Sequence, residues 1–347
     1  MRLAEVVPVT QDQAVALSLA PSLPRIDLTA RMHASDPELL QLANAHLSLV
    51  DQARRRARDA GVSIVTWMDP EFPQLLLNLT DCPPALWYRG TLATSERTCV
   101  AIVGSRAATA VALELGARIA AQLARTGVVV VSGLARGVDS AAHNGALTGG
   151  TTIAVLGSGP DVVYPAEHRA LAETVSQRGL LLSEHPPGTP PLPFHFPLRN
   201  RLISGLSRAV VVIEAAEESG SLITAACALE QGREVMVVPG NALSGRNRGG
   251  HALIRDGARI VESAEDVLGE LGLGPASDGS KGGASGGAAV DPLLALMDEG
   301  EVFDLDQLTS ALGIPAPRLL ARLLELEIQG VVARAGSGRF VRLRRTC

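Results

Sequence analysis

The stretch TCVAIVGSRAATAVALELGARIAAQLARTGVVVVSGLARG, residues 98–137, decides the fold class of this chain. Two short apolar runs rich in β-branched residues, 99–103 and 128–131, flank a stretch of helical period at 109–125. Apolar runs of this length are typical of strands buried on both faces, and strand–helix–strand order is typical of a parallel sheet. The stretch therefore predicts one unit of an α/β fold.

The same alternation continues toward the C-terminus. Apolar runs occupy residues 152–156, 179–182, 209–213 and 234–238, and a further helical stretch occupies 138–147. Right-handed crossovers place the carboxyl ends of parallel strands along one edge of the sheet, where ligands of such folds bind. We expect a parallel sheet that is covered by helices on both faces.

Small and polar residues gather after the ends of these strands. They are Gly104, Ser105 and Arg106, then residues 132–137, 157–159, Glu214 with 219–221, and 239–241. Small residues let the amides at helix N-termini approach an anion closely. Glycine and serine are also common in ordinary turns and caps, so each cluster alone has a structural explanation. Five clusters at one edge, two of which contain arginine, favour an anion-binding site.

The loop SEHPPGTPPLPFHFPLRNR, residues 183–201, is a second candidate site. Long loops without secondary structure are usually either functional or disordered. This one contains Phe194 and Phe196, two of only five phenylalanines in the chain, beside His195. It ends in Arg199, Asn200 and Arg201. Aromatic rings beside guanidinium groups suit single-stranded nucleic acid, although the two rings could instead only fix the loop to the core.

The composition excludes several classes of protein. Lys281 is the only lysine, so a Walker-type phosphate loop and a Schiff-base lysine are absent from the predicted sheet domain. The four cysteines have no paired spacing, which argues against a zinc site or a disulfide framework and favours a reducing compartment. The net charge of -5 argues mildly against a general nucleic-acid binder, but a local basic site is compatible with it.

The chain shows no membrane or export signal. No positively charged start followed by an apolar run opens the sequence, and the longest apolar runs are too short to cross a bilayer. We expect a cytoplasmic protein without a membrane partner.

Different patterns surround the predicted sheet. Residues 1–60 predict a small helical (SAM-like) module, and residues 62–67 and 85–89 predict two short strands. The basic cluster Arg54, Arg55, Arg56 and Arg58 could contact phosphate, but a solvated helix face explains it better. We expect the sheet domain to span residues 61–270.

The C-terminal part has a recognisable order. Residues 271–290 are rich in Gly, Ala and Ser and predict a flexible linker. Residues 291–347 predict three helices, the second capped by Asp304, and a hairpin at 331–333 and 340–343, which together make a winged helix-turn-helix. Its third helix balances Arg318 and Arg322 against Glu325 and Glu327, which favours a protein contact over binding to duplex DNA.

Catalytic chemistry has weak support in the sequence. Asp139 and His143 share a helix face near Ser132 and Ser140, so a nucleophile with an acid and a base could be drawn from them. A structural role explains these residues better. Asp139 lies at the positive end of its helix, and His143 either packs in the core or caps a backbone group. No cluster with metal-ligand spacing accompanies them, and the fingerprint GxGxxG is absent after the first strand. We expect a binding platform without metal, cofactor or catalytic residues.

Several motifs resemble the DNA-processing protein A family (DprA, also called Smf). They are GSR at 104–106, SGLARGVDSAAHNGAL at 132–147, TIAVLGSG at 152–159 with Tyr164 and Pro165, FPLRNRLISGLS at 196–207 and VVVIEAAEESGSLITAACALEQGREVMVVPG at 210–240. The resemblance runs through about residues 98–262. It implies an extended Rossmann-like core in a cytoplasmic bacterial homodimer that binds single-stranded DNA. It further implies that the protein protects DNA taken up in natural transformation and helps to load the RecA recombinase onto it.

The resemblance also implies a set of strand-binding positions. They are Gly104, Ser105, Arg106, Gly133, Arg136, Phe196, Arg199, Asn200, Arg201, Ser219, Gly220 and Ser221. The near absence of lysine departs from the family, because arginine must hold phosphate wherever relatives use lysine.

Two other functions remain open. The phosphoribohydrolases similar to the cytokinin-activating LOG proteins have a related fold and split nucleotides with an Arg and with the Glu of a PGGxGTxxE motif. At the matching place this chain has SGSLITAA, residues 219–226, which lacks the paired glycines and the carboxylate. The third possibility is an adaptor whose arginine-containing loop binds an acidic protein.

Overall fold

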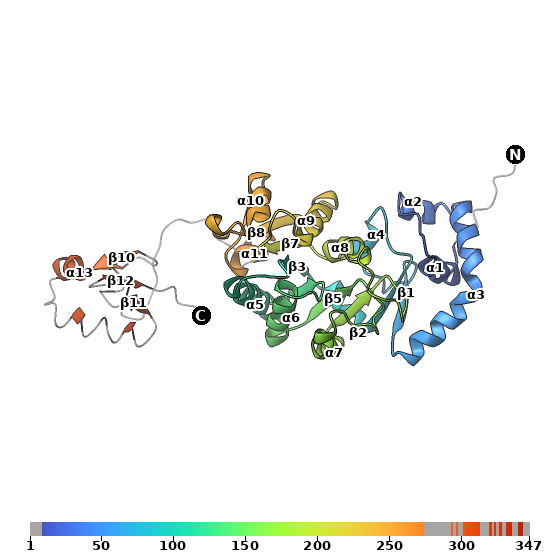
Figure 1. The fold of residues 1–347 in the computed structure, drawn as a ribbon, viewed down its shortest axis with the longest axis horizontal. Helices are drawn as coiled ribbons and strands as arrows, with labels where there is room; N and C mark the ends of the chain where they lie inside the picture. Colours follow the sequence, from blue (N-terminus) through green and yellow to red (C-terminus); the bar gives the residue numbers. More distant parts are fainter. Residues whose placement is uncertain are drawn as a thin grey trace. The chain divides into compact units, whose positions relative to one another are not determined.

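The computed structural model describes residues 9–273 and part of the C-terminal region, namely residues 293, 296–297, 301–312, 319–320, 323, 326–327, 331–334 and 339–342. The chain divides into two compact units, Met1–Ser277 and Asp278–Cys347 (Figure 1). The predicted linker at 271–290 lies almost entirely outside the described residues.

The first unit is built on a nine-stranded sheet with the order β1-β2-β6-β5-β4-β3-β7-β8-β9. The strands are β1 (Ser63–Thr66), β2 (Ala85–Gly90), β3 (Cys99–Gly104), β4 (Val129–Ser132), β5 (Thr152–Leu156), β6 (Leu180–Ser183), β7 (Ala209–Ile213), β8 (Glu234–Val238) and β9 (Arg259–Ile260). From β6 to β9 all neighbours are parallel, which confirms the predicted α/β sheet. The predicted strands at 62–67 and 85–89 form an antiparallel extension, with β2 paired to β6.

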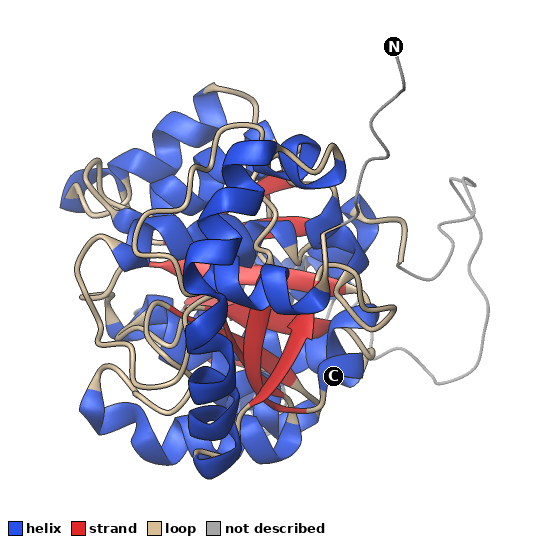
Figure 2. Cartoon of the chain, turned by 90° about the vertical axis from the view of Figure 1, so that its right-hand side faces the viewer, coloured by secondary structure: helices blue, strands red, loops and turns tan. Residues whose placement is uncertain are grey.

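Helices cover both faces of this sheet (Figures 1 and 2). They are α4 (Gln74–Leu77), α5 (Ala110–Arg125), α6 (Val138–Gly149), α7 (Arg169–Arg178), α8 (His195–Gly205), α9 (Gly220–Glu230), α10 (Arg248–Arg255) and α11 (Ala264–Glu270). Successive strand residues point to opposite faces, so Val100 and Ile102 pack with α5, α6 and α11, whereas Ala101 and Val103 pack with α8 and α9. None of the helices in the described parts of the chain is long and apolar enough to cross a membrane.

The N-terminal helices pack on the same core as the sheet. They are α1 (Gln11–Ser18), α2 (Leu28–His33) and α3 (Pro37–Asp59). The carboxylate of Asp36 accepts hydrogen bonds from the amides of Glu38 and Leu39, and Pro37 occupies the first turn, which explains where α3 begins. Leu17 and Leu39 are buried in one cluster with Trp87 of β2. The helical N-terminal region predicted from the sequence is therefore present and shares its hydrophobic core with the sheet.

The second unit contains a three-stranded antiparallel sheet among its described residues. Its order is β10 (Val302–Asp304), β12 (Arg339–Arg342) and β11 (Val332–Arg334), and α13 (Leu305–Leu312) follows β10. The predicted hairpin and the helix after Asp304 are confirmed, whereas β10 was not predicted. Most of the predicted third helix, with Arg318, Arg322 and Glu325, lies outside the described residues.

The order of the strands reverses between β3 and β7. From β3 the chain proceeds through β4, β5 and β6 on one side, and it then returns to build β7, β8 and β9 on the other. Ligands of doubly wound sheets bind in the crevice outside the strand ends at such a point. In the register of β3 and β7, Gly104 lies opposite Ile213. The loops after these two residues therefore flank the crevice.

Candidate nucleic-acid interface

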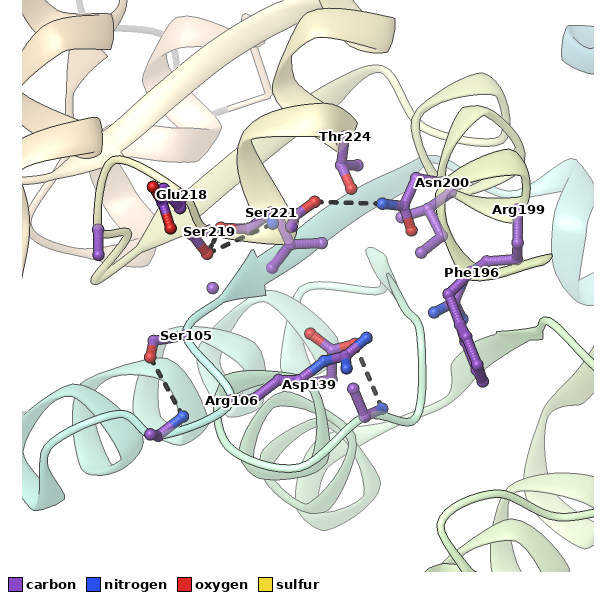
Figure 3. Close-up of a pocket in the computed structure, with 17 residues that line it drawn as sticks. Ser105, Arg106, Asp139, Phe196, Arg199, Asn200, Glu218, Ser219, Ser221 and Thr224 are labelled. Carbon is purple, nitrogen blue, oxygen red and sulfur yellow. Dashed lines mark hydrogen bonds between the residues drawn. The ribbon is translucent and has the colours of Figure 1, made fainter. Parts of the chain in front are cut away.

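A pocket of about 500 Å³ lies in the crevice outside β3 and β7. It gathers most of the positions that the sequence resemblance assigned to strand binding, namely Gly104, Ser105, Arg106, Phe196, Arg199, Asn200, Ser219, Gly220 and Ser221. Figure 3 shows that the labelled side chains come from three places. Ser105 and Arg106 follow β3, Phe196, Arg199 and Asn200 lie in the first half of α8, and Ser219 and Ser221 lie at the start of α9. The clusters after β3 and before α9 therefore converge with the phenylalanine segment, whereas the clusters at 157–159 and 239–241 do not line the pocket.

The start of helix α9 forms one wall of the pocket. The hydroxyl of Ser219 accepts a hydrogen bond from the amide of Ser221 at 3.4 Å and caps the helix. Gly220 is exposed, and a Cβ added there would meet nothing within 4 Å. The first amides of a helix have no acceptor within it, and together with the helix dipole they attract anions. The side-chain amide of Asn200 donates to the Gly220 carbonyl at 3.2 Å and joins α8 to this wall.

An aromatic and cationic cluster forms the opposite wall. The guanidinium carbon of Arg106 lies 5.8 Å from the centroid of the Phe196 ring, within reach of a cation–π interaction. The Tyr164 ring lies 5.5 Å from the Phe196 ring at an angle of 43°. Phe196 rests against Gly157, where a Cβ would come within 3.0 Å of the ring. An exposed arginine and a half-buried ring therefore lie together at the mouth of the pocket.

Arg199 lies in the floor of the pocket and is almost fully buried. Its Nη1 donates to the carbonyl of Gly133 at 2.7 Å and also to the carbonyl of Val155. Gly133 permits this contact, since a Cβ there would lie 2.5 Å from the guanidinium nitrogens. Burial lowers the pKa of Arg199 to about 10, so the side chain remains charged at neutral pH. Arg199 thus joins α8 to the ends of β4 and β5, and it places positive charge beneath the pocket.

Asp139 faces the same floor and was not predicted to be part of the site. Its carboxylate accepts hydrogen bonds from the amides of Gly133 at 3.1 Å and Ala135 at 3.3 Å. Burial raises the pKa of Asp139, and the nearby charge of Arg199 opposes that shift. The amide of Gly133 is therefore already occupied. Gly133 supports the site by making room for Arg199, and its amide is not free to bind phosphate.

The serine and the histidine that could have formed a nucleophilic centre do not contact each other. The hydroxyl of Ser132 donates to the carbonyl of Ile102 at 2.7 Å. The Nδ1 of His143 lies 2.7 Å from the hydroxyl of Thr152, which itself donates to the carbonyl of Val130. Burial lowers the pKa of His143 to about 3, so the imidazole is neutral. These contacts give Ser132 and His143 structural roles. Among the described residues, no group of three or more His, Cys, Asp or Glu could hold a metal ion.

The part of the chain that contains the pocket matches a known protein family. The chain matches the model of the DNA recombination-mediator protein A family over residues 63–272. It belongs to that family. A second match, to the DprA winged helix domain, covers residues 284–338.

Individual relatives agree with this assignment. Protein Smf of Escherichia coli (strain K12) is 43% identical over 289 residues, which cover 80% of this chain and 77% of that protein. DNA processing protein DprA of Streptococcus pneumoniae is 46% identical over 205 residues, which cover 59% of this chain and 72% of the relative.

Two solved structures resemble this chain. The X-ray structure of DNA processing protein A from Streptococcus pneumoniae has a TM-score of 0.63 and 37% identity, and it covers 76% of this chain and 93% of that chain. DNA processing protein A from Helicobacter pylori has a TM-score of 0.56 and 28% identity, and the match covers 61% of this chain and 97% of that chain. The latter structure is described as giving insights into a unique single-stranded DNA binding mode.

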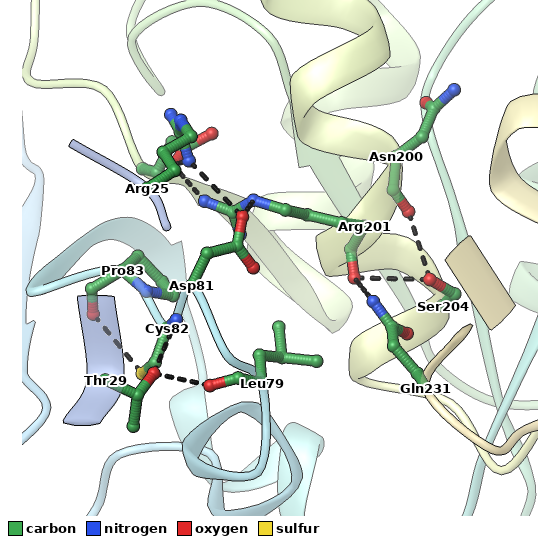
Figure 4. Close-up of polar contacts among 11 residues, drawn as sticks. Arg25, Thr29, Leu79, Asp81, Cys82, Pro83, Asn200, Arg201, Ser204 and Gln231 are labelled. Carbon is green, nitrogen blue, oxygen red and sulfur yellow. Dashed lines mark hydrogen bonds and ion pairs between the residues drawn. The ribbon is translucent and has the colours of Figure 1, made fainter. Parts of the chain in front are cut away.

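Arg201, which the family resemblance assigned to strand binding, lies away from the pocket. Its Nε lies 2.7 Å from Asp81 and its Nη2 lies 2.6 Å from Glu184, which also binds Arg25 at 3.1 Å. Figure 4 shows Arg25, Asp81 and Arg201 directed toward one another. Because α8 begins at His195, earlier than the predicted loop end, residues two apart point to opposite sides of the helix. Arg201 therefore belongs to a buried ion-pair network.

The same network contains two carboxylates, Glu184 and Asp81, whose pKa values are shifted in opposite directions. Burial raises the pKa of Glu184, but Arg201 and Arg25 outweigh this effect and hold it below its ordinary value. Burial raises the pKa of Asp81 above its ordinary value despite the same two arginines. Glu184 is the stronger partner of Arg201 on geometric grounds, because it is more deeply buried and lies at the shorter distance. The network fixes α8 to the N-terminal helical region.

Arg136 also does not line the pocket, although it is exposed. Its Nε and Nη2 donate to the two carboxylate oxygens of Glu167 at 2.5 and 2.9 Å. Glu214, another residue of the predicted rim, accepts from the amide and the hydroxyl of Thr109 and holds the start of α5. Tyr164 and Glu218 were missed as parts of the site. Both residues stand in the family motifs quoted above, Tyr164 with residues 152–159 and Glu218 within residues 210–240 just before the α9 cap.

Proposed function

We propose that this family member binds single-stranded DNA in the pocket outside β3 and β7 and catalyses no reaction. The observation that carries the proposal is the convergence of Arg106, Phe196 and the start of α9 around one opening. These elements supply a cation for phosphate, a ring for base stacking and helix amides for a second anionic group. Stacking and phosphate contacts together are the means by which proteins hold single strands without reading sequence.

The family membership supports the same proposal. The related protein from Helicobacter pylori is described by its single-stranded DNA binding mode, and it aligns with 61% of this chain. The positions that carry the pocket in this chain lie within residues 63–272, the part that matches the family model. The bound strand is the proposed ligand, and no cofactor or metal enters the proposal.

Replacing Phe196 by alanine is expected to weaken binding of oligo-dT by about 1–3 kcal/mol, because a base loses its stacking partner. Fluorescence anisotropy with labelled oligo-dT and with duplex of equal length measures the effect, and the parent protein is expected to prefer the single strand.

Arg106→Gln should lower the slope of log affinity against log salt by about 0.7, since one phosphate contact is lost.

The control for these variants is Leu229→Ala. Leu229 is an exposed residue at the far end of α9, and its replacement is expected to leave binding unchanged. If Phe196→Ala and Arg106→Gln bind oligo-dT with the affinity and salt slope of the parent, the strand does not lie in this pocket.

A nucleotide phosphoribohydrolase is the alternative function, and the pocket offers little for it. Its lining includes the carboxylates of Asp139 and Glu218 only. Asp139 is buried and binds two loop amides, and Glu218 precedes the cap of α9. Incubation with nucleoside monophosphates is expected to release no free base, as followed by chromatography. Release of base would show that the site is catalytic.

An adaptor function would need the arginine-containing loop to bind an acidic protein, but Arg199 and Arg201 are buried, which leaves Arg106 as the exposed arginine of the pocket. If Arg106 binds an acidic protein, a glutamate-rich peptide should compete with oligo-dT at comparable concentration. We expect no such competition, because a peptide carries no bases for Phe196.

The cellular role that we propose rests on family membership. In it, a cytoplasmic homodimer protects DNA taken up in natural transformation and helps to load RecA onto the strand. Protection of oligo-dT from a single-strand nuclease, faster assembly of RecA on coated strands and a dimeric mass in solution test the three parts separately.

A further inference from the structure

A second groove lies beyond the candidate interface, beside the loop that follows β6. A cavity of about 570 Å³ separates residues 17–25 from residues 184–198, and a smaller one of about 190 Å³ continues from it toward α3. Both cavities are lined by Leu19 and Pro186, so they adjoin each other between the N-terminal helices and the sheet domain, and we call the two together the groove.

The groove and the pocket lie on the same edge of the sheet. The pocket follows β3 and β7, Phe196 rests on Gly157 after β5, and the groove contains Glu184 and His185 after β6. The order β7-β3-β4-β5-β6 places these features in sequence along one rim. Neighbouring strands are about 4.8 Å apart, so β3 and β6 are separated by roughly 14 Å. A few nucleotides of an extended strand cover that distance.

An exposed aromatic ring stands at the entrance of the groove. Phe194 is 60% exposed, and its ring lies 4.5 Å from that of His195 in an edge-to-face arrangement. His195 in turn stacks on His185 with centroids 3.9 Å apart. Phe194 therefore contributes little to the core and presents its ring to solvent. Phe194 and Phe196 flank His195, the first residue of α8, whose amide donates to the carbonyl of Leu192 at 3.0 Å.

A free cation lies at the other end of the groove. Arg56 of α3 is exposed beside Pro186 and Pro187, and within residues 9–273 no carboxylate lies at ion-pair distance from it. Its neighbour Arg54, by contrast, pairs with Asp12 at 2.6 Å. The carboxylate that lines the groove, that of Glu184, is matched by Arg25, which also lines it, and by the buried Arg201. Arg56 therefore gives this end of the groove its positive charge.

We propose that the single strand continues from the pocket past the first turn of α8 into this groove, with a base on Phe194 and a phosphate on Arg56. The inference rests on the proposed binding of single-stranded DNA and extends its path. It also gives a role to one arginine of the basic cluster in α3. A strand fits better than a peptide, because the groove continues a rim that already carries a ring and a cation suited to nucleotides.

A length series of oligo-dT tests this path. Phe194→Ala is expected to leave the shortest oligonucleotides that fill the pocket unaffected, and to weaken binding of longer ones at least about fivefold, since a stacked base is lost. Arg56→Gln is expected to lower the salt slope by about 0.7 for the longer oligonucleotides only. Leu229→Ala and Arg208→Gln are matched controls, because both residues are exposed at the opposite edge of the sheet.

The variant Phe196→Ala distinguishes a wrong proposal about the groove from a wrong proposal about the pocket. If it binds every length like the parent, the proposed site itself is wrong. If it binds weakly while Phe194→Ala and Arg56→Gln hold long oligonucleotides like the parent, only the groove proposal is overturned. The groove proposal would also be overturned if Phe194→Ala lowered the affinity for short and long oligonucleotides equally, because Phe194 would then act within the pocket. Both replaced side chains are exposed, so thermal melting should show parent-like folding.

Discussion

Replacing Arg199 by leucine is expected to lower the free energy of unfolding by about 2–4 kcal/mol, because it leaves buried carbonyl groups without a donor and removes a positive charge near the buried carboxylate of Asp139. Arg199 is 3% exposed and Asp139 is 7% exposed, so water reaches neither group well. The two hydrogen bonds that are lost are those to the carbonyls of Gly133 and Val155. Urea denaturation followed by circular dichroism measures the loss.

A double-mutant cycle identifies the cause of that loss. If losing the nearby charge at Asp139 contributes to the destabilisation, the variant Arg199→Leu, Asp139→Asn should be more stable than the sum of the single changes predicts, by at least about 1 kcal/mol. Arg208→Leu is the control, since Arg208 is exposed and should change stability by less than about 0.5 kcal/mol. A parent-like midpoint for Arg199→Leu would show that Arg199 does not hold the floor of the pocket.

The sheet could be predicted because its strands have a strong local signal. Val100 to Val103 and Val129 to Val131 are apolar at every position, as strands buried on both faces must be, and their alternate residues do enter different cores. The antiparallel edge of the sheet, formed by β1 and β2, could not be predicted in the same way. The pairing of β2 with β6 joins segments about ninety residues apart, and no local pattern specifies such a contact.

The site was predictable to the extent that it follows from strand order. Clusters after parallel strands must meet at one edge, and Arg106, Ser219 and Phe196 do line one pocket. Arg201 could not be separated from Arg199 in the sequence, because the prolines before His195 suggest a loop that runs on to residue 201. Once α8 begins at His195, helical geometry turns Arg199 and Arg201 to opposite sides. The ion pairs to Asp81 and Glu184 then account for Arg201.

Replacing Gly104 by alanine is expected to reduce both stability and binding of single-stranded DNA, because β3 and β7 leave no room for a side chain. A Cβ at Gly104 would overlap the carbonyl oxygen of Ile213 and lie 2.7 Å from Cγ2 of Val138. Inserting a methyl group into a close-packed site costs about 1–3 kcal/mol or more. The strands must move apart at the mouth of the pocket, directly before Ser105, so oligo-dT should bind more weakly. Thermal melting and anisotropy measure the two effects.

The second pocket glycine, Gly220, is the matched control. A Cβ there meets nothing within 4 Å, so Gly220→Ala should fold at least as stably as the parent. Its methyl group would nevertheless stand before the first amides of α9, where we place a phosphate. Affinity should therefore fall at unchanged stability. If Gly220→Ala binds like the parent while Gly104→Ala does not, the strand does not approach α9, and the pocket binds DNA through Arg106 and Phe196 alone.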